Sequence, residues 1–262
     1  MPLCKNGIRK LLDRNFAIKA SKKRPVIGIL LDHQQEGPFS RRPHYLLRKA
    51  YFDAVWRAGG LPVALPYVEE AMENFLSLCH GLILPGGTYP FPEQLYELDA
   101  VHNKKNNLRY QFEAKFTRCA LNSKIPLLGI CAGMQIIAAV KGATFYRDVR
   151  TELPTDIDHL NASPAETPAH DISVIPETLL RRVLKVDRLK VNTAHKEAIR
   201  GNFSNLTISA RAPDGVIEGI EIPNHHFCIG VQWHPEFFAR KGDPNLNLFT
   251  ALITAAKSEE TK

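Results

Sequence analysis

Residues 125–135, IPLLGICAGMQ, decide the fold of this 262-residue chain. An apolar run passes directly into GICAG (residues 129–133), and helix-forming residues follow. This pattern is typical of the G-x-nucleophile-x-G turn between a strand and a helix, with cysteine in the place of serine. The two glycines permit a sharp turn, and the N-terminus of the following helix favours a thiolate at Cys131. The alternative is a buried cysteine at an ordinary strand-to-helix turn.

The sequence around this turn alternates short apolar runs with stretches of helical spacing. Continuous apolar runs predict buried strands over residues 26–31, 61–65, 81–84 and 126–130. Helical spacing predicts helices over residues 45–58, 71–79, 108–121, 134–140 and 245–256. Further strands are expected over 172–175, 206–212, 216–222 and 227–233, and several of them are expected to be antiparallel. The order predicts an α/β fold with a doubly wound, mostly parallel central sheet, helices on both faces and some antiparallel strands in the C-terminal part.

A second motif follows the last predicted strand, in FCIGVQWHPEF (residues 227–237). Pro235 restricts His234 to extended geometry, in which residues two apart point the same way. Glu236 is then expected beside His234, where a carboxylate orients an imidazole that acts as a base. The alternative is a solvent-facing strand end with an incidental histidine.

The third motif is LPGGT (residues 84–88), at the end of another predicted strand. Its glycine amides, together with the amide of Ala132, are positioned to bind an oxyanion. The alternative is a plain Gly-Gly turn. Sites in parallel sheets gather at the carboxyl ends of the strands, and all three motifs lie there. We therefore expect Cys131, His234 and Glu236 to share one site.

With these motifs the chain resembles the class I glutamine amidotransferase-like superfamily, and within it the gamma-glutamyl-gamma-aminobutyrate hydrolase branch. The resemblance covers about residues 25–255. The stretches that carry it are AGGLPVALP (58–66), GLILPGG (81–87), the helix with Arg109 and Glu113, VNTAH (191–195), APDGVIEGIE (212–221) and IGVQWHPE (229–236).

The resemblance implies a cysteine-dependent hydrolase that cleaves a gamma-glutamyl amide through a glutamyl thioester. Cys131 would attack the amide, His234 would move the proton and Glu236 would hold His234. The resemblance also implies the remaining site residues, which are Gly87 and Ala132 for the backbone oxyanion hole, and Gly86, Gln135, Asn192 and His195 for substrate binding.

Departures from the family pattern occur where the leaving group is expected, at Thr88, Tyr110, Lys196 and Glu197. Two rival functions therefore stay open. One is a glutaminase subunit that supplies ammonia to a synthase partner, although the chain has no synthase domain of its own. The other is a catalytically weak binding or regulatory protein on the same scaffold.

The excess charge of +7 lies entirely in residues 1–24, and the rest of the chain has 26 basic and 26 acidic residues. We expect a basic N-terminal extension over residues 1–24 and a single hydrolase domain over residues 25–257. The extension is a frayed tail, a basic amphipathic helix or a transit peptide, and its partner is unknown. The balanced body does not predict nucleic-acid binding.

Five cysteines without paired spacing indicate a reducing compartment, so a cytoplasmic location is expected. No apolar run reaches the roughly 18 residues of a membrane span, and no secretory signal is evident. A homodimer is compatible with the sequence. No cofactor and no metal are expected, since His159 and His170 have no cysteine or carboxylate partner at ligand spacing and are interpreted as parts of the substrate loop.

Overall fold

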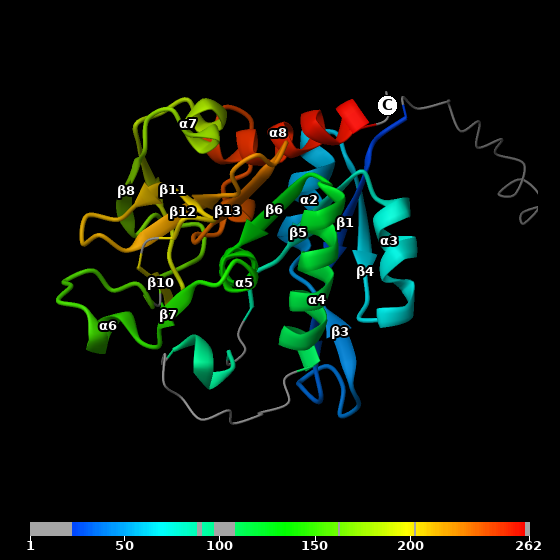
Figure 1. Cartoon of the computed structure of the whole chain (residues 1–262), viewed down its shortest axis with the longest axis horizontal. Helices are drawn as coiled ribbons and strands as arrows, with labels where there is room; N and C mark the ends of the chain where they lie inside the picture. The colour runs from blue at the N-terminus through cyan, green and yellow to red at the C-terminus, as the bar shows by residue number, and fades with distance from the viewer. Residues whose placement is uncertain (1–22, 88–90, 97–107, 162, 202, 260–262) are drawn as a thin grey trace, which may run out of the picture.

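A nine-stranded sheet organises the chain in this computed structural model, which describes residues 23–87, 91–96, 108–161, 163–201 and 203–259 (Figure 1). The basic extension up to residue 22 and Thr88 lie outside the described residues. The strands follow one another across the sheet in the order β4 (Leu61–Leu65), β1 (Val26–Leu30), β5 (Gly81–Leu84), β6 (Leu127–Ile130), β13 (Cys228–Val231), β12 (Ile217–Glu221), β11 (Thr207–Arg211), β8 (His170–Val174) and β9 (Arg188–Val191).

The sheet divides into a parallel half and an antiparallel half. Strands β4, β1, β5, β6 and β13 run parallel to one another, with Leu84 opposite Gly129 and Val231 opposite Ile130 at their carboxyl ends. Strands β12, β11, β8 and β9 pair antiparallel. This architecture confirms the predicted mixed, mostly parallel α/β sheet.

Helices cover both faces of the sheet, and the sheet separates two apolar core regions (Figure 1). One face packs against α2 (Lys49–Ala58), α7 (Leu179–Leu184) and α8 (Pro244–Glu259), and the other against α3 (Met72–Leu78), α4 (Leu108–Ser123) and α5 (Ala132–Val140). The remaining elements are the pairs β2 (Asp32–Gln34) with β3 (His44–Leu46) and β7 (Thr144–Tyr146) with β10 (Ala198–Arg200), the short α6 (Val149–Glu152), and the 3-10 turns η1 (Glu69–Ala71), η2 (Glu93–Leu95) and η3 (Pro235–Phe237).

The predicted helix over residues 45–58 is wrong at its start. Residues His44–Leu46 pair with β2, and Arg48 is extended (φ −66°, ψ 135°), so α2 begins at Lys49. The apolar spacing does not distinguish β3 from the first turn of a helix. The pairing of β3 with β2 decides its structure. The short elements β7, β9, β10 and α7 were not predicted, because three to six residues are too few to show a clear apolar period.

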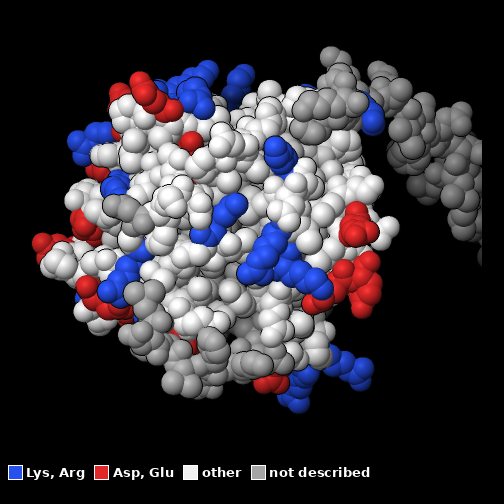
Figure 2. Space-filling view, viewed as in Figure 1, with Lys and Arg blue, Asp and Glu red and all other residues white. Residues whose placement is uncertain are grey.

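Charged side chains are interspersed on the face of the molecule shown in Figure 2, where basic and acidic groups lie among uncharged ones. This distribution agrees with the balanced charge of the chain after residue 24. Among the described residues, no helix has the length and apolar character needed to cross a membrane.

Two glycines let β5 and β6 approach α5 closely. A Cβ on Gly133 would lie 2.0 Å from the carbonyl oxygen of Leu84, and one on Gly129 would lie 2.6 Å from the carbonyl oxygen of Gly133. Both obstacles are backbone atoms, which cannot rotate away. The first turn of α5 therefore sits against the ends of β5 and β6 only because these positions have no side chain.

Substitution Gly133→Ala tests this packing. The added methyl group must push α5 from β5, and we expect the melting temperature to fall by roughly 4–8 °C, from an overpacking cost of about 2 kcal/mol. The control is Gly81→Ala, whose Cβ would meet the Ile27 and Leu252 side chains at 3.1 and 3.3 Å and Pro126 O at 3.4 Å. Equal melting temperatures for the two variants, measured by calorimetry, would contradict the packing argument.

Candidate active site

Cys131 stands at the turn between β6 and α5 in a backbone conformation that side chains rarely adopt. Its φ is 53° and its ψ is −110°, and it is the N-cap of α5. Such strain persists only where the surroundings impose it, and here the glycine packing of β5 and α5 does so. The turn directs the thiol away from the strand and places it at the positive end of the helix dipole.

His234 and Glu236 follow β13, which is the parallel neighbour of β6. The imidazole Nδ1 lies 2.8 Å from Glu236 Oε1, and both residues are buried. The extended geometry predicted after His234 is wrong, because residues Pro235–Phe237 form the turn η3. Glu236 reaches the imidazole from this turn, so the predicted contact forms by a different backbone route.

The electrostatic surroundings favour a charged imidazole at His234. Burial alone would lower its pKa, but the neighbouring Glu236 carboxylate and the Cys131 thiol raise the pKa of His234 to about 10. The ring therefore carries a proton at neutral pH. A cation beside a cysteine favours the thiolate, which is the nucleophilic form.

Tyr51 of α2 lies behind the pair and was not predicted as a site residue. Its hydroxyl accepts the Gly86 amide at 2.9 Å, and a Cβ on Gly86 would lie 2.5 Å from the His234 ring. Burial first, and then the charge of Glu236, raise the pKa of Tyr51, so its hydroxyl stays protonated. Tyr51 thus holds the Gly-Gly turn against the imidazole.

Arg109 of α4 fixes the same turn from the other side. Its guanidinium donates to the carbonyls of Pro85 and Gly86 at 3.2 and 3.4 Å. It also pairs with Asp32 and Glu113, each at 2.8 Å, and is almost completely buried. A buried arginine shared by two carboxylates and two carbonyls gives the turn that ends at Gly87 a fixed position.

A cavity of about 350 Å³ opens above the thiol. It is bounded by both predicted oxyanion-hole residues, by the predicted substrate residues Gln135 and His195, and by two residues at which the chain departs from the family pattern. The full lining is Gly87, Phe91, Cys131, Ala132, Gln135, Leu160, Ala194, His195, Lys196 and Glu197. Tyr110, another residue at which the chain departs from the family pattern, packs its ring against Phe91.

Two of the predicted substrate residues, Asn192 and Gln135, form hydrogen bonds within the protein. Asn192 bonds both backbone polar groups of His234, accepting its amide at 2.8 Å and donating to its carbonyl at 3.2 Å. It does not line the cavity and instead positions the imidazole. The Gln135 amide donates to Gln232 Oε1 and to the Glu197 carbonyl, each at 3.1 Å.

Gln232 is a further site residue that the sequence reasoning missed. Its side chain contacts the Cys131 sulfur, with Nε2 donating at 3.5 Å. The signal was present, because Gln232 stands within the GVQWHPE stretch, but nothing in the spacing distinguishes its role from that of a core residue.

Comparisons with known proteins agree with this fold and site. The family model of Peptidase C26 matches residues 25–236. A glutamine amidotransferase-like protein of Rickettsia prowazekii is 32% identical, covering 90% of this chain and 99% of its own length. The gamma-glutamyl-gamma-aminobutyrate hydrolase PuuD of Escherichia coli is 28% identical, covering 89% and 94%.

Solved structures share the fold at lower identity. A GMP synthase subunit of Thermoplasma acidophilum has a TM-score of 0.62 at 18% identity, covering 91% of this chain and 98% of its own. A glutamine amidotransferase of Thermotoga maritima has a TM-score of 0.57 at 16% identity, covering 92% and 99%.

The fold and the motifs define a class I glutamine amidotransferase-like protein, as the sequence predicted. Within that class, the chain belongs to the Peptidase C26 family and is similar to its gamma-glutamyl-gamma-aminobutyrate hydrolase branch. The family and its relatives support an enzyme of hydrolase or amidotransferase type.

Substitution Glu236→Gln tests the electrostatics of the pair. Removing the carboxylate charge lets burial dominate, so the pKa of His234 falls and the imidazole is neutral at pH 7 for more of the time. We expect Cys131 to be alkylated by iodoacetamide roughly tenfold more slowly at pH 7, because fewer molecules then hold a charged imidazole beside the thiol. The free, partly exposed Cys119 is the internal reference, read by mass mapping of the same digest.

The matched control is Glu73→Gln, which removes an exposed carboxylate from α3. It should leave the ratio of the two alkylation rates unchanged. If Glu236→Gln left that ratio unchanged as well, Glu236 would not govern the charge of His234.

Proposed function

We propose that this protein is a cysteine-dependent hydrolase of gamma-glutamyl amides, with gamma-glutamyl-gamma-aminobutyrate-like compounds as its substrates. The observation that carries the proposal is that Cys131, which lines one small cavity, lies beside the buried His234–Glu236 pair. The oxyanion-hole amides and the similarity to PuuD support it.

In the first half of the reaction, the Cys131 sulfur attacks the gamma carbonyl carbon and forms a carbon–sulfur bond. The amides of Gly87 and Ala132 stabilise the oxyanion of the tetrahedral intermediate. His234 holds the proton of the thiol and gives it to the leaving amine as the carbon–nitrogen bond breaks. The products of this half are a free amine and a glutamyl thioester on Cys131.

In the second half, water attacks the thioester and His234 accepts a proton from it. The carbon–sulfur bond then breaks and glutamate leaves. The Cys131 sulfur is left beside the protonated His234, as at the start of the reaction. Glu236 stabilises the imidazolium. Because Tyr51, Gln232 and Asn192 hold the reacting groups in place, little reorganisation is needed between the two halves.

The cavity also presents opposite charges to a substrate. Lys196 and Glu197 line its wall beyond Cys131, and Tyr96 donates to the Glu197 carboxylate at 3.1 Å. The alpha carbon of a gamma-glutamyl group carries an ammonium and a carboxylate, which have the matching charges. We assign Glu197 to the ammonium and Lys196 to the carboxylate of the glutamyl group, in place of the contact with the leaving group that the sequence led us to expect.

The test is a panel of gamma-glutamyl amides that includes gamma-glutamyl-gamma-aminobutyrate and glutamine, with release of glutamate and of each amine measured separately. We expect purified protein alone to hydrolyse at least one gamma-glutamyl amide faster than glutamine. Cys131→Ala should lower kcat by roughly 10⁴-fold or more, because the nucleophile and its base act as one unit. Cys119→Ala is the matched control and should leave turnover unchanged.

The rival functions give different results in the same assay. A glutaminase subunit would release ammonia from glutamine only after a partner is added, and would ignore the other amides. A binding or regulatory protein would release no glutamate from any of them, with wild type and Cys131→Ala alike. Either result contradicts the proposal.

A further inference from the structure

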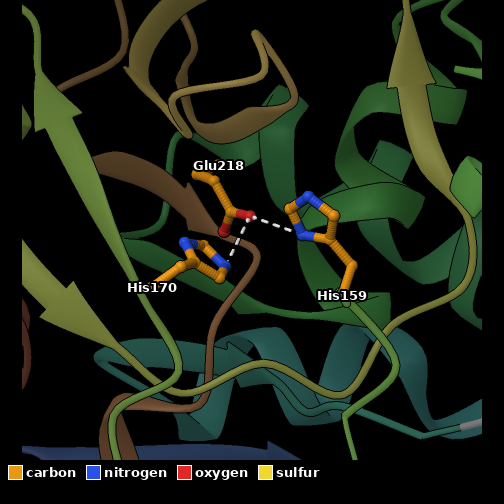
Figure 3. Close-up of side chains that lie close together, drawn as sticks. All are labelled: His159, His170 and Glu218. Atoms are coloured by element: carbon orange, nitrogen blue, oxygen red, sulfur yellow. Dashed lines mark ion pairs between the residues drawn. The ribbon is translucent and has the colours of Figure 1, made fainter. Parts of the chain in front are cut away.

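A second group of ionisable side chains lies beside the candidate active site, around Glu218 of β12. Figure 3 shows His159 and His170 turned toward this carboxylate from opposite sides. Glu218 Oε1 lies 3.5 Å from His159 Nδ1, 3.5 Å from His170 Nε2 and 3.4 Å from His195 Nε2. His195 Nε2 is also 3.2 Å from His159 Nδ1. Four potential ligand atoms thus converge from a loop, two strands and the segment after β9.

Glu218 is completely buried, and neither of its carboxylate oxygens has a hydrogen-bond partner. The three imidazole contacts lack the geometry of hydrogen bonds, and His170 Nε2 is likewise unpartnered. A buried carboxylate without a bonded partner is costly, so a positive charge is needed at this point.

The outer nitrogens of the three imidazoles are all engaged with acceptors. His159 Nε2 lies 2.8 Å from the Asp214 carboxylate. His170 Nδ1 lies 3.1 Å from the Asp171 carbonyl, and His195 Nδ1 lies 3.0 Å from the Glu197 carbonyl. A carbonyl or carboxylate requires a proton on the nitrogen that faces it. The outer nitrogens therefore carry protons, and loss of the proton shared by His159 Nδ1 and His195 Nε2 leaves the inner nitrogens as lone pairs that face Glu218.

We propose that His159, His170 and Glu218 bind a divalent transition-metal ion of the Zn²⁺ type, with His195 at the adjacent fourth position. Ligand atoms of a tetrahedral zinc site with bonds of about 2.0–2.1 Å are separated by roughly 3.3–3.4 Å. The separations from Glu218 Oε1 to the three rings and between the His159 and His195 rings are 3.2–3.5 Å and match this spacing, and the ligand atoms of His159, His170 and Glu218 all lie within 4.8 Å of one another. Imidazole nitrogens with one carboxylate are the donor set that zinc prefers, and outer nitrogens held by Asp214 and by carbonyls are its usual support.

A cavity at the surface gives an ion access to this group. It has a volume of about 590 Å³, and His170 forms part of its wall together with Asp156 and Asp158. The two acidic residues attract a cation to the entrance. On the inner side, His195 lines the cavity above Cys131. The bound ion would therefore fasten the loop around His159 to the wall of the active site.

The experiment uses the full chain, stripped of metal and titrated first with Co²⁺ and then with Zn²⁺. We expect one Co²⁺ per chain, with visible absorption of tetrahedral nitrogen and oxygen coordination and without a thiolate band. Zn²⁺ should displace it and raise the melting temperature by roughly 5–10 °C when it is in large excess over its dissociation constant. Cys131→Ala should bind the ion equally well, which separates this site from the catalytic thiol.

Variants then assign the ligands. His170→Ala and Glu218→Gln should lose at least about 100-fold in affinity, and Asp214→Asn, which touches only the outer nitrogen of His159, about 10–100-fold. His226→Ala, an exposed histidine elsewhere on the molecule, is the matched control and should bind as wild type does.

If the folded wild type binds neither ion at micromolar concentrations and its melting temperature does not move, the positive charge is a proton on an imidazole and the proposal is wrong. Full affinity in folded Asp214→Asn and His170→Ala would overturn it as well. Neither outcome depends on hydrolysis, so this test is independent of the proposed activity.

Discussion

The close approach of α5 to the ends of β5 and β6 is the constraint on which the rest of the site depends. Gly133 contacts the Leu84 carbonyl where no side chain would fit, and this contact holds Cys131 at a positive φ. Because β5, β6 and β13 are parallel neighbours, their carboxyl ends lie side by side. The Gly-Gly turn, the cysteine and His234 therefore meet without any long loop having to fold over the sheet.

Buried charge then fixes the groups that the sheet brings together. Arg109 secures the Gly-Gly turn through two carbonyls, and Glu236 keeps the imidazole of His234 charged. The Glu218 group lies on the other side of the cavity wall. His195 belongs to both, because it contacts Glu218 and lines the cavity. Each of these groups is costly to bury alone, and each is supported by several partners from distant parts of the chain. Preorganisation of this kind is what a site needs when charge develops during a reaction.

Much of the fold and the centre of the site could be predicted from the sequence, for physical reasons. The strands β1, β5 and β6 are buried on both faces, so they appear in the sequence as continuous apolar runs. The two glycines of GICAG allow the sharp turn at Cys131, so this turn is also visible in the sequence. Glu236 lies two residues from His234, so their contact is local even though its backbone route was mispredicted. By contrast, Tyr51, Arg109 and Glu218 act through neighbours far away in sequence. Glu218 supplies the carboxylate missing from the spacing of His159 and His170, and only the pairing of strands brings it there.

The central claim is that Cys131 carries the glutamyl group during turnover. Rapid quenching in acid of the enzyme with a gamma-glutamyl amide, followed by intact mass spectrometry and peptide mapping, measures this directly. The account predicts a transient mass increase of one glutamyl group on the peptide that contains Cys131, formed and lost at rates consistent with kcat. Glutamate release without such an adduct, or an adduct on another residue, would contradict it.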